Sequence, residues 1–168
     1  MGISVIPAPS AGSKTLKRTT LTSGTSYTVP AGVTEINVVL FGAGGGGGGA
    51  GGSGSDGSAG GSTTMTGATT ATGGRAGRDR NRSSDSITNN APNSNTGKGG
   101  SGQERTESQT GFMRAFDGQD GDITVSTLSV TPTQSIAYSI GAGGSGGSSN
   151  NGSGTAGASG KIEVEYWS

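Results

Sequence analysis

The sequence predicts an all-β protein: a small antiparallel, sandwich-like base of about six strands that carries long glycine-rich loops. Three observations support this fold class. The large apolar residues gather in two regions, 15–41 and 123–167, with few between them. Both regions show the period-two alternation of strands, and no window shows helical periodicity. Glycine supplies 37 of the 168 residues, roughly three times the usual share of about 7%.

The clearest strands are the stretches VTEINVVLF at 33–41 and KIEVEYW at 161–167. The first is rich in β-branched residues, and its second half is apolar on both faces, which is typical of a strand buried on both sides. The second alternates strictly, which predicts an inward face of Ile162, Val164 and Tyr166 and an outward face of Glu163 and Glu165.

Further strands are predicted at 15–21, 123–130 and 135–140, the last with Ile136, Tyr138 and Ile140 on one face. Two turns connect them. In SYTVPAGV, Pro30 and Gly32 suit the second and fourth positions of a tight turn, and Thr-Pro-Thr-Gln turns the chain into the strand at 135–140.

Strands 33–41 and 135–140 both end in Gly-Ala-Gly-Gly, which predicts a long insert at about 42–121 and a shorter one at about 141–160. The predicted domain covers 15–168, and residues 1–14, with two prolines, read as an extended arm that docks onto another protein. The apolar core is small for one domain, so we expect a homo-oligomer, with a trimer favoured, or docking onto a larger protein.

Every third residue from 42 to 60 is glycine. Three residues per turn is the polyproline-II repeat, in which such spacing leaves one face free of side chains. This predicts ordered polyglycine-II helices that bond sideways to each other. The alternative is a flexible Gly/Ser linker. A linker should join two folded units, however, whereas this stretch leaves a strand and returns to the same base.

Composition excludes several kinds of chemistry. The chain has no cysteine and no histidine, which removes thiolate chemistry and the commonest general base. The scaffold offers little apolar wall to raise the pKa of a catalytic acid, so we expect no enzyme and no cofactor. No segment approaches the ~20 apolar residues of a membrane helix, so membrane insertion is not expected.

Three ordered stretches carry a family resemblance: VPAGVTEINVVLFGAGGGGGG, TLSVTPTQSIAYSIGAGGSGG and SGKIEVEYW. Together they resemble the glycine-rich domain of bacteriophage tail proteins, over about 26–49 and 123–168. The insert from 62 to 121 departs from that family's plainer glycine runs. The composition is also similar to that of phage adhesins whose tips are built from polyglycine-II helices.

The resemblance implies a structural protein of the phage tail (fibre, tip or minor tail protein) on the virion surface that contributes to host receptor binding. Its implied partners are other virion proteins and a host surface receptor. The alternative is a capsid or tail decoration protein with an architectural role only. A third class, a nucleic-acid or cell-wall glycine-rich protein, stays open.

The candidate contact residues for a receptor or surface lie in the long insert: Arg75, Arg78, Arg80, Arg82, Phe112, Arg114 and Phe116. The arginines could bind phosphate or acidic sugars, or form a solvated loop. No aromatic residue interleaves them, which argues against nucleic acid. The phenylalanines could pin the returning loop to the base or form an exposed patch.

Two more features have open interpretations. Asp117, Asp120 and Asp122 are ligands of the type that calcium prefers, but their spacing is not that of an EF-hand, and no metal site is predicted. Tyr166 and Trp167 lie on opposite faces of the last strand, so one should pack in the core and the other should meet a partner or a sugar.

Overall fold

The computed structural model describes residues 12, 14–49, 54–79, 104–107, 111–149 and 152–168. The described residues form nine strands and no helix, which confirms the predicted all-β class. No described segment is therefore a helix long and apolar enough to cross a membrane. The predicted N-terminal arm falls almost wholly outside these residues.

Four antiparallel strands form the larger sheet, in the order β1-β9-β3-β7. Their bounds are Leu16–Leu21 for β1, Glu35–Phe41 for β3, Ile123–Ser129 for β7 and Lys161–Trp167 for β9. Both chain ends of the domain meet at one end of β1 and β9, where Thr15 and Ser168 exchange backbone hydrogen bonds of 2.7 and 3.1 Å. The sheet therefore closes the first and last strands of the domain onto each other.

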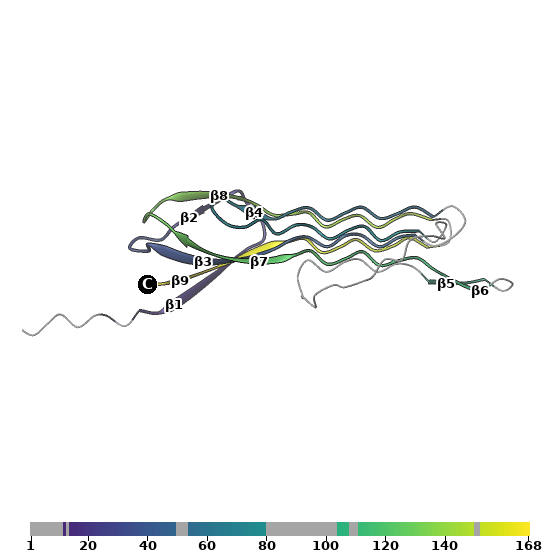
Figure 1. The fold of residues 1–168 in the computed structure, drawn as a ribbon, viewed down its shortest axis with the longest axis horizontal. Coiled ribbons are helices and arrows are strands. Elements are labelled where there is room, and N and C mark those ends of the chain that lie inside the picture. The colour runs from purple at the N-terminus through teal and green to yellow at the C-terminus, as the bar shows by residue number, and fades with distance from the viewer. Residues whose placement is uncertain (1–11, 13, 50–53, 80–103, 108–110, 150–151) are drawn as a thin grey trace, which may run out of the picture.

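A second sheet has the order β2-β8-β4, with β2 at Ser26–Thr28, β4 at Thr64–Met65 and β8 at Ser135–Ser139. A separate hairpin pairs β5 (Glu104–Glu107) with β6 (Gly111–Arg114). Figure 1 shows the two sheets together at one end of the molecule and the hairpin at the other. The two sheets are called the base below.

The core lies between the two sheets and consists of inward residues from both. The predicted inward face of β9 is confirmed, because Ile162 and Val164 are fully buried and Tyr166 packs against the cluster. The predicted face of β8 is also confirmed for Ile136 and Tyr138. The rest of the cluster comes from Tyr27, Val29, Val33, Ile36, Val38, Leu40, Met65, Ala71 and Leu128.

Two local predictions need correction. Strand β3 is buried on its inner face only: Val39 and Phe41 on the outer face are half-buried, because no second described sheet covers that face. The turn before β3 spans Pro30–Val33, closed by the Val33 amide on the Pro30 carbonyl at 3.2 Å. Gly32 is thus third in the turn rather than fourth, and its φ of 80° is the conformation that glycine favours there.

The long insert returns to the base halfway along, which the sequence analysis did not predict. Strand β4 pairs with β8, and a bridge joins Thr63 to Ala71. Thr63 is fully buried, and its hydroxyl accepts a hydrogen bond from the Gly141 amide at 3.1 Å. Residues 63–71 therefore anchor the insert to the sheet from which the shorter insert starts.

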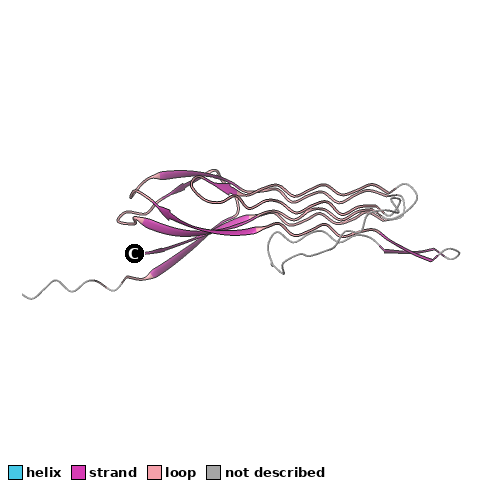
Figure 2. Ribbon diagram, in the orientation of Figure 1, coloured by secondary structure: helices cyan, strands magenta, loops and turns pink. Residues whose placement is uncertain are grey.

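Six described segments leave or return to the base and bond sideways to one another. We call this set the glycine bundle; Figures 1 and 2 show it as long parallel traces without strands. Its segments are 42–49, 55–61, 72–78, 116–122, 141–148 and 154–160. The hydrogen bonds run between segments, which is the lateral pattern expected for polyglycine-II packing.

Segment 42–49 lies at the centre of the bundle and is entirely buried. Its amides donate in rotation to three neighbours: Gly45 bonds Gln119, Gly46 bonds Ser58 and Gly47 bonds Thr155, at 2.9, 2.9 and 3.0 Å. Its carbonyls accept from two more segments, through Gly74 and Gly77 on one side and Gly144 and Gly147 on the other. The glycine spacing of three in the sequence thus matches the spacing at which hydrogen bonds to the same neighbouring segment recur.

These bonds explain why glycine recurs. A Cβ added at Gly45 would overlap the carbonyl of Arg75, and one at Gly46 would overlap the carbonyl of Ser145. Neither glycine has a positive φ, so close backbone approach, and not an unusual conformation, requires the missing side chain.

Candidate functional site

Two of the candidate arginines lie along one flank of the bundle. Arg75 is exposed and Arg78 is half-buried, both on segment 72–78. Because the backbone of that segment completes one turn about every three residues, side chains three positions apart project on the same side. Their carbonyls accept hydrogen bonds from the Gln119 and Phe116 amides, each at 2.9 Å. The backbone therefore places the two arginine residues in one row along the segment.

The structure brings Phe116 beside this row but leaves the other candidates apart. Phe116 is half-buried, and its carbonyl accepts a hydrogen bond of 2.9 Å from the amide of Gly48. Phe112 and Arg114 belong to β6, paired with Thr106 and Glu104 of β5 at the far end of the molecule. Arg80 and Arg82 fall outside the described residues.

A row of serines on another flank was missed by the sequence analysis. Ser58 and Ser145 join their hydroxyls at 3.0 Å, and Ser55 and Ser148 do so at 3.3 Å. Two of these hydroxyls also accept a hydrogen bond from a backbone amide across the same pair of segments: the Ser145 amide donates to Ser58 Oγ at 2.7 Å, and the Ser148 amide donates to Ser55 Oγ at 2.9 Å. The signal was present as serine at a spacing of three in both inserts. This flank offers exposed hydroxyls, which suit sugar or water contacts.

The aspartates of the bundle mainly serve its own structure. Asp122 accepts a hydrogen bond from the Thr72 hydroxyl, and Asp56 accepts one from the Asp79 amide at 2.8 Å. Asp117 and Asp120 also have partners. Within the described residues, no group of three or more acidic side chains could hold a metal ion, so the calcium alternative gains no support.

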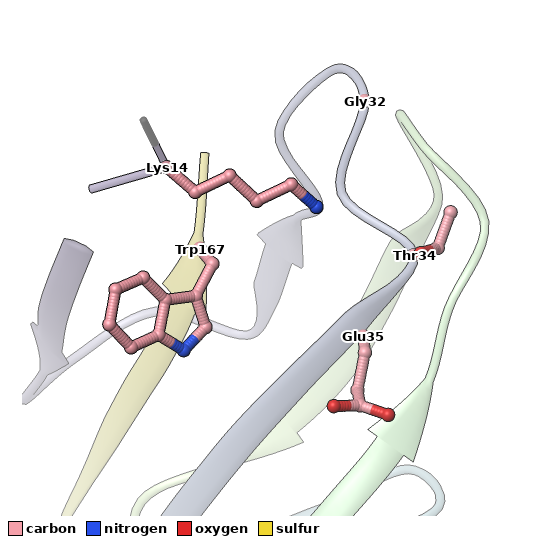
Figure 3. Close-up of a pocket in the computed structure, with 5 residues that line it drawn as sticks. All are labelled: Lys14, Gly32, Thr34, Glu35 and Trp167. Carbon is pink, nitrogen blue, oxygen red and sulfur yellow. The ribbon is translucent and has the colours of Figure 1, made fainter. Parts of the chain in front are cut away.

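A small pocket lies at the opposite end of the molecule, where the two chain ends of the domain meet. Figure 3 shows its lining, which consists of Lys14, Gly32, Thr34, Glu35 and Trp167. The Trp167 side chain is 55% exposed, whereas its neighbour Tyr166 packs on the core. This matches the expected division of the two aromatics between the core and the outside. An exposed indole beside a lysine and a glutamate suits contact with a peptide.

One core tyrosine has an unusual electrostatic setting. The Tyr27 side chain is buried, and its hydroxyl has no hydrogen-bond partner in the described part of the chain. Burial, and secondly the nearby Tyr166, raises the pKa of Tyr27 above its ordinary value. Tyr138 differs, because its hydroxyl donates to the Ser23 carbonyl at 2.6 Å. The raised pKa of Tyr27 therefore follows from its place in the core.

No protein-family model matches the chain, and no curated protein matches it significantly. The tail-protein resemblance therefore depends on the three quoted sequence stretches. Two of them map onto comparable places, since β3 and the strand region of β8 each pass directly into a bundle segment, at 42 and at 141.

Proposed function

We propose that this chain is a structural protein of a bacteriophage virion, located in the tail as a fibre, tip or minor tail protein. In this proposal it contributes to binding of a host surface receptor. The observation that carries the proposal is the elongated arrangement of a β base with a bundle of glycine-rich segments running away from one end of it. Such a shape holds the far ends of the bundle segments at a distance from the base.

The second observation that supports the proposal is the position in the structure of the sequence stretches that carry the resemblance. The strands that end in Gly-Ala-Gly-Gly are the ones that feed the bundle, and the closing strand KIEVEYW is β9, at the middle of the larger sheet. The motifs of the resemblance thus belong to the scaffold. The receptor-facing part would then be the residues that differ, above all the long insert with Arg75 and Arg78.

The two ends would have different roles. The base end carries the Trp167 pocket and the start of the domain, so it suits attachment to another virion protein through the arm 1–14. The bundle flank carries the arginine row, which suits phosphate or acidic sugars of a cell surface because guanidinium groups bind such oxygens in pairs. We propose no enzymatic activity, no cofactor and no nucleic-acid partner.

The test has two parts. Antibody against the protein, gold-labelled and imaged on intact particles, should mark the tail. Purified protein should slow adsorption of the phage to its host, and the double variant Arg75→Ala, Arg78→Ala should compete less well. A matched control is Lys17→Ala, which removes an exposed positive charge from β1 in the base.

Label on the capsid, with no competition by the purified protein, would favour the architectural decoration role instead. Label absent from all particles would reject both virion roles. Competition that is equal for the wild-type protein and the double variant would retain receptor binding but move it away from the arginine row.

A further inference from the structure

The larger sheet has two edges, and they differ in character. Strands β1 and β7 lie at its ends. Strand β1 reads LKRTTL, and β7 reads ITVSTLS. Lysine and arginine on an edge strand discourage pairing with another chain, whereas a long uncharged edge strand is a template for it. By this criterion β1 is protected against pairing with a strand of another chain, whereas β7 is available for it.

The side chains of β7 reinforce this difference. Val125 is 69% exposed and Ile123 is 40% exposed, and both lie on the outer face of the sheet. Their partners in register are Val39 and Phe41, which are half-buried on the same face. An apolar patch of these four residues therefore reaches the edge of the sheet, and its most exposed member lies on the edge strand.

The backbone of β7 is paired on one side only. All seven of its residues lie in register with β3, from Ile123 opposite Phe41 to Ser129 opposite Glu35. On the other side, no described strand pairs with it. Two side chains of β7 bond to the backbone of Thr69: Ser126 accepts from its amide at 3.0 Å, and Thr124 donates to its carbonyl at 2.7 Å. Both side chains belong to the inner face, on the same side as the buried Leu128.

We infer that β7 is a homodimer interface, at which the β7 strands of two copies pair antiparallel about a two-fold axis. The resulting sheet would have eight strands, and it would join the two apolar patches on one face. The inference concerns the base alone and does not depend on the proposed function.

The lack of charge on β7 is compatible with a second copy of the chain as its partner. The strand carries no charge, so two copies of β7 can lie side by side without like charges facing each other. Pairing all seven residues places Ser126 opposite itself and Val125 opposite the partner's Thr127. The two Val125 side chains then lie diagonally across the axis on the same face, about 7–8 Å apart between Cα atoms. This pairing removes the most exposed apolar side chain of the edge strand from water.

Analytical ultracentrifugation of the full chain across a range of concentrations tests this inference. We expect a monomer–dimer equilibrium for the wild-type protein. Val125→Lys places two like charges beside the axis, so its dissociation constant should rise at least about tenfold. Thr20→Lys is the matched control, because Thr20 is an exposed residue on the outer face of the other edge. It should dimerise like the wild-type protein.

Cross-linking supplies a second measurement, which does not require that the protein still folds with a lysine at position 125. The chain has no cysteine, so Val125→Cys provides a single thiol. A bismaleimide of about 8 Å span should link two copies of this variant, since that span matches the diagonal distance. Thr20→Cys should stay unlinked.

Three results would overturn the inference. A wild-type protein that is monomeric at every concentration has no such interface. An assembly unaffected by Val125→Lys uses another surface. A trimer or longer oligomer weakened by both lysine variants would mean that β7 pairs with β1 of the next copy.

Discussion

The base and the glycine bundle hold together by opposite means. In the base, side chains from two sheets fill a core in which Ile36, Val38, Leu40, Ile162 and Val164 are almost fully buried. In the bundle, segment 42–49 is equally buried, yet Ala43 is its one residue with a side chain. The buried surface there is backbone: each amide of the segment donates to a carbonyl of a neighbouring segment, and the carbonyls of Ala43, Gly44, Gly46 and Gly47 accept from neighbouring amides.

This difference shows two ways to bury a chain. Burying apolar side chains stabilises the base through removal of carbon surface from water. Buried backbone groups in the bundle must each find a partner, because an unpaired buried amide or carbonyl costs about 1–3 kcal/mol. The base should therefore respond to lost volume, and the bundle should respond to added volume.

The largest expected effect is loss of volume in the base. Leu40 is fully buried at the centre of the larger sheet, so Leu40→Ala should lower the free energy of unfolding by about 2–5 kcal/mol. Chemical denaturation followed by Trp167 fluorescence measures it. Thr20→Ser, at an exposed position of β1 outside the inferred interface, should change it by less than about 0.5 kcal/mol. Equal effects would mean that the core does not lie between the two sheets.

Added volume in the bundle should have the next largest effect. In Gly46→Ala the new methyl overlaps the Ser145 carbonyl and pushes segment 141–148 away from the centre. The two bonds from Gly144 and Gly147 to the central segment would be lost, at about 1 kcal/mol each.

Amide hydrogen exchange reports this change residue by residue. Protection should fall at Gly144 and Gly147, while amides of β3 and β9 keep theirs. Ala59→Ser, at an exposed position of the bundle, is the control and should leave protection unchanged. Amides of 42–49 that exchange freely even in the wild-type protein would instead favour the flexible linker.

The base was largely predictable from sequence, for a physical reason. Alternating side chains in KIEVEYW and SIAYSI encode which face is buried, because only one face can meet the core. The same rule failed for the outer face of β3, where Val39 and Phe41 are apolar but only half-buried. Alternation states which residues are apolar, and it does not state whether a second layer covers them.

Of the bundle, only the repeat of three residues could be predicted from the sequence. Glycine spacing of three indicated sideways contacts, but it carries no information about which segments are neighbours. The return of the chain at Thr64–Met65 was missed because two residues give no periodic signal. Of the candidate site, Arg75 and Arg78 do form one row, while the serine row needed the pairing of segments before it became visible.

A smaller effect, of opposite sign at two sites, comes from the core tyrosines. Tyr138→Phe removes the hydrogen bond to Ser23 and should destabilise the base by about 1 kcal/mol. Tyr27→Phe removes a buried hydroxyl without a partner and should stabilise it by a similar amount. Thermal or denaturant unfolding of the pair measures both. Destabilisation by both variants would show that the Tyr27 hydroxyl has a partner.

The pKa of Tyr27 adds a pH dependence to the same pair. Its pKa in the folded protein is raised above 10.0, first by burial and then by Tyr166. As pH rises past about 10, the unfolded chain loses this proton while the folded protein keeps it, so stability falls. Tyr27→Phe should reduce this loss of stability at alkaline pH. Below about pH 9 it should leave the pH dependence of the free energy of unfolding unchanged.

The smallest expected effect concerns two turns of the base. Thr133 holds a φ of 66° in the turn closed by the Gln134 amide on the Thr131 carbonyl, and Gly32 holds 80° in the turn at Pro30–Val33. A Cβ costs about 1–2 kcal/mol in that conformation, and glycine loses about 0.5–1 kcal/mol more entropy on folding. Thr133→Gly should therefore stabilise the base by about 0.5 kcal/mol, and Gly32→Ala should destabilise it by a similar amount.

Denaturant midpoints of the two variants check the sign, and open space around Gly32 means that only its backbone conformation is tested. A loss of stability in Thr133→Gly would show that the threonine side chain contributes more than its backbone costs. These two variants also bear on the comparison between the base and the bundle. The base holds a Cβ at Thr133 even in a left-handed conformation. The bundle accepts none at Gly46 even in an ordinary conformation, because a neighbouring carbonyl occupies the place of that Cβ.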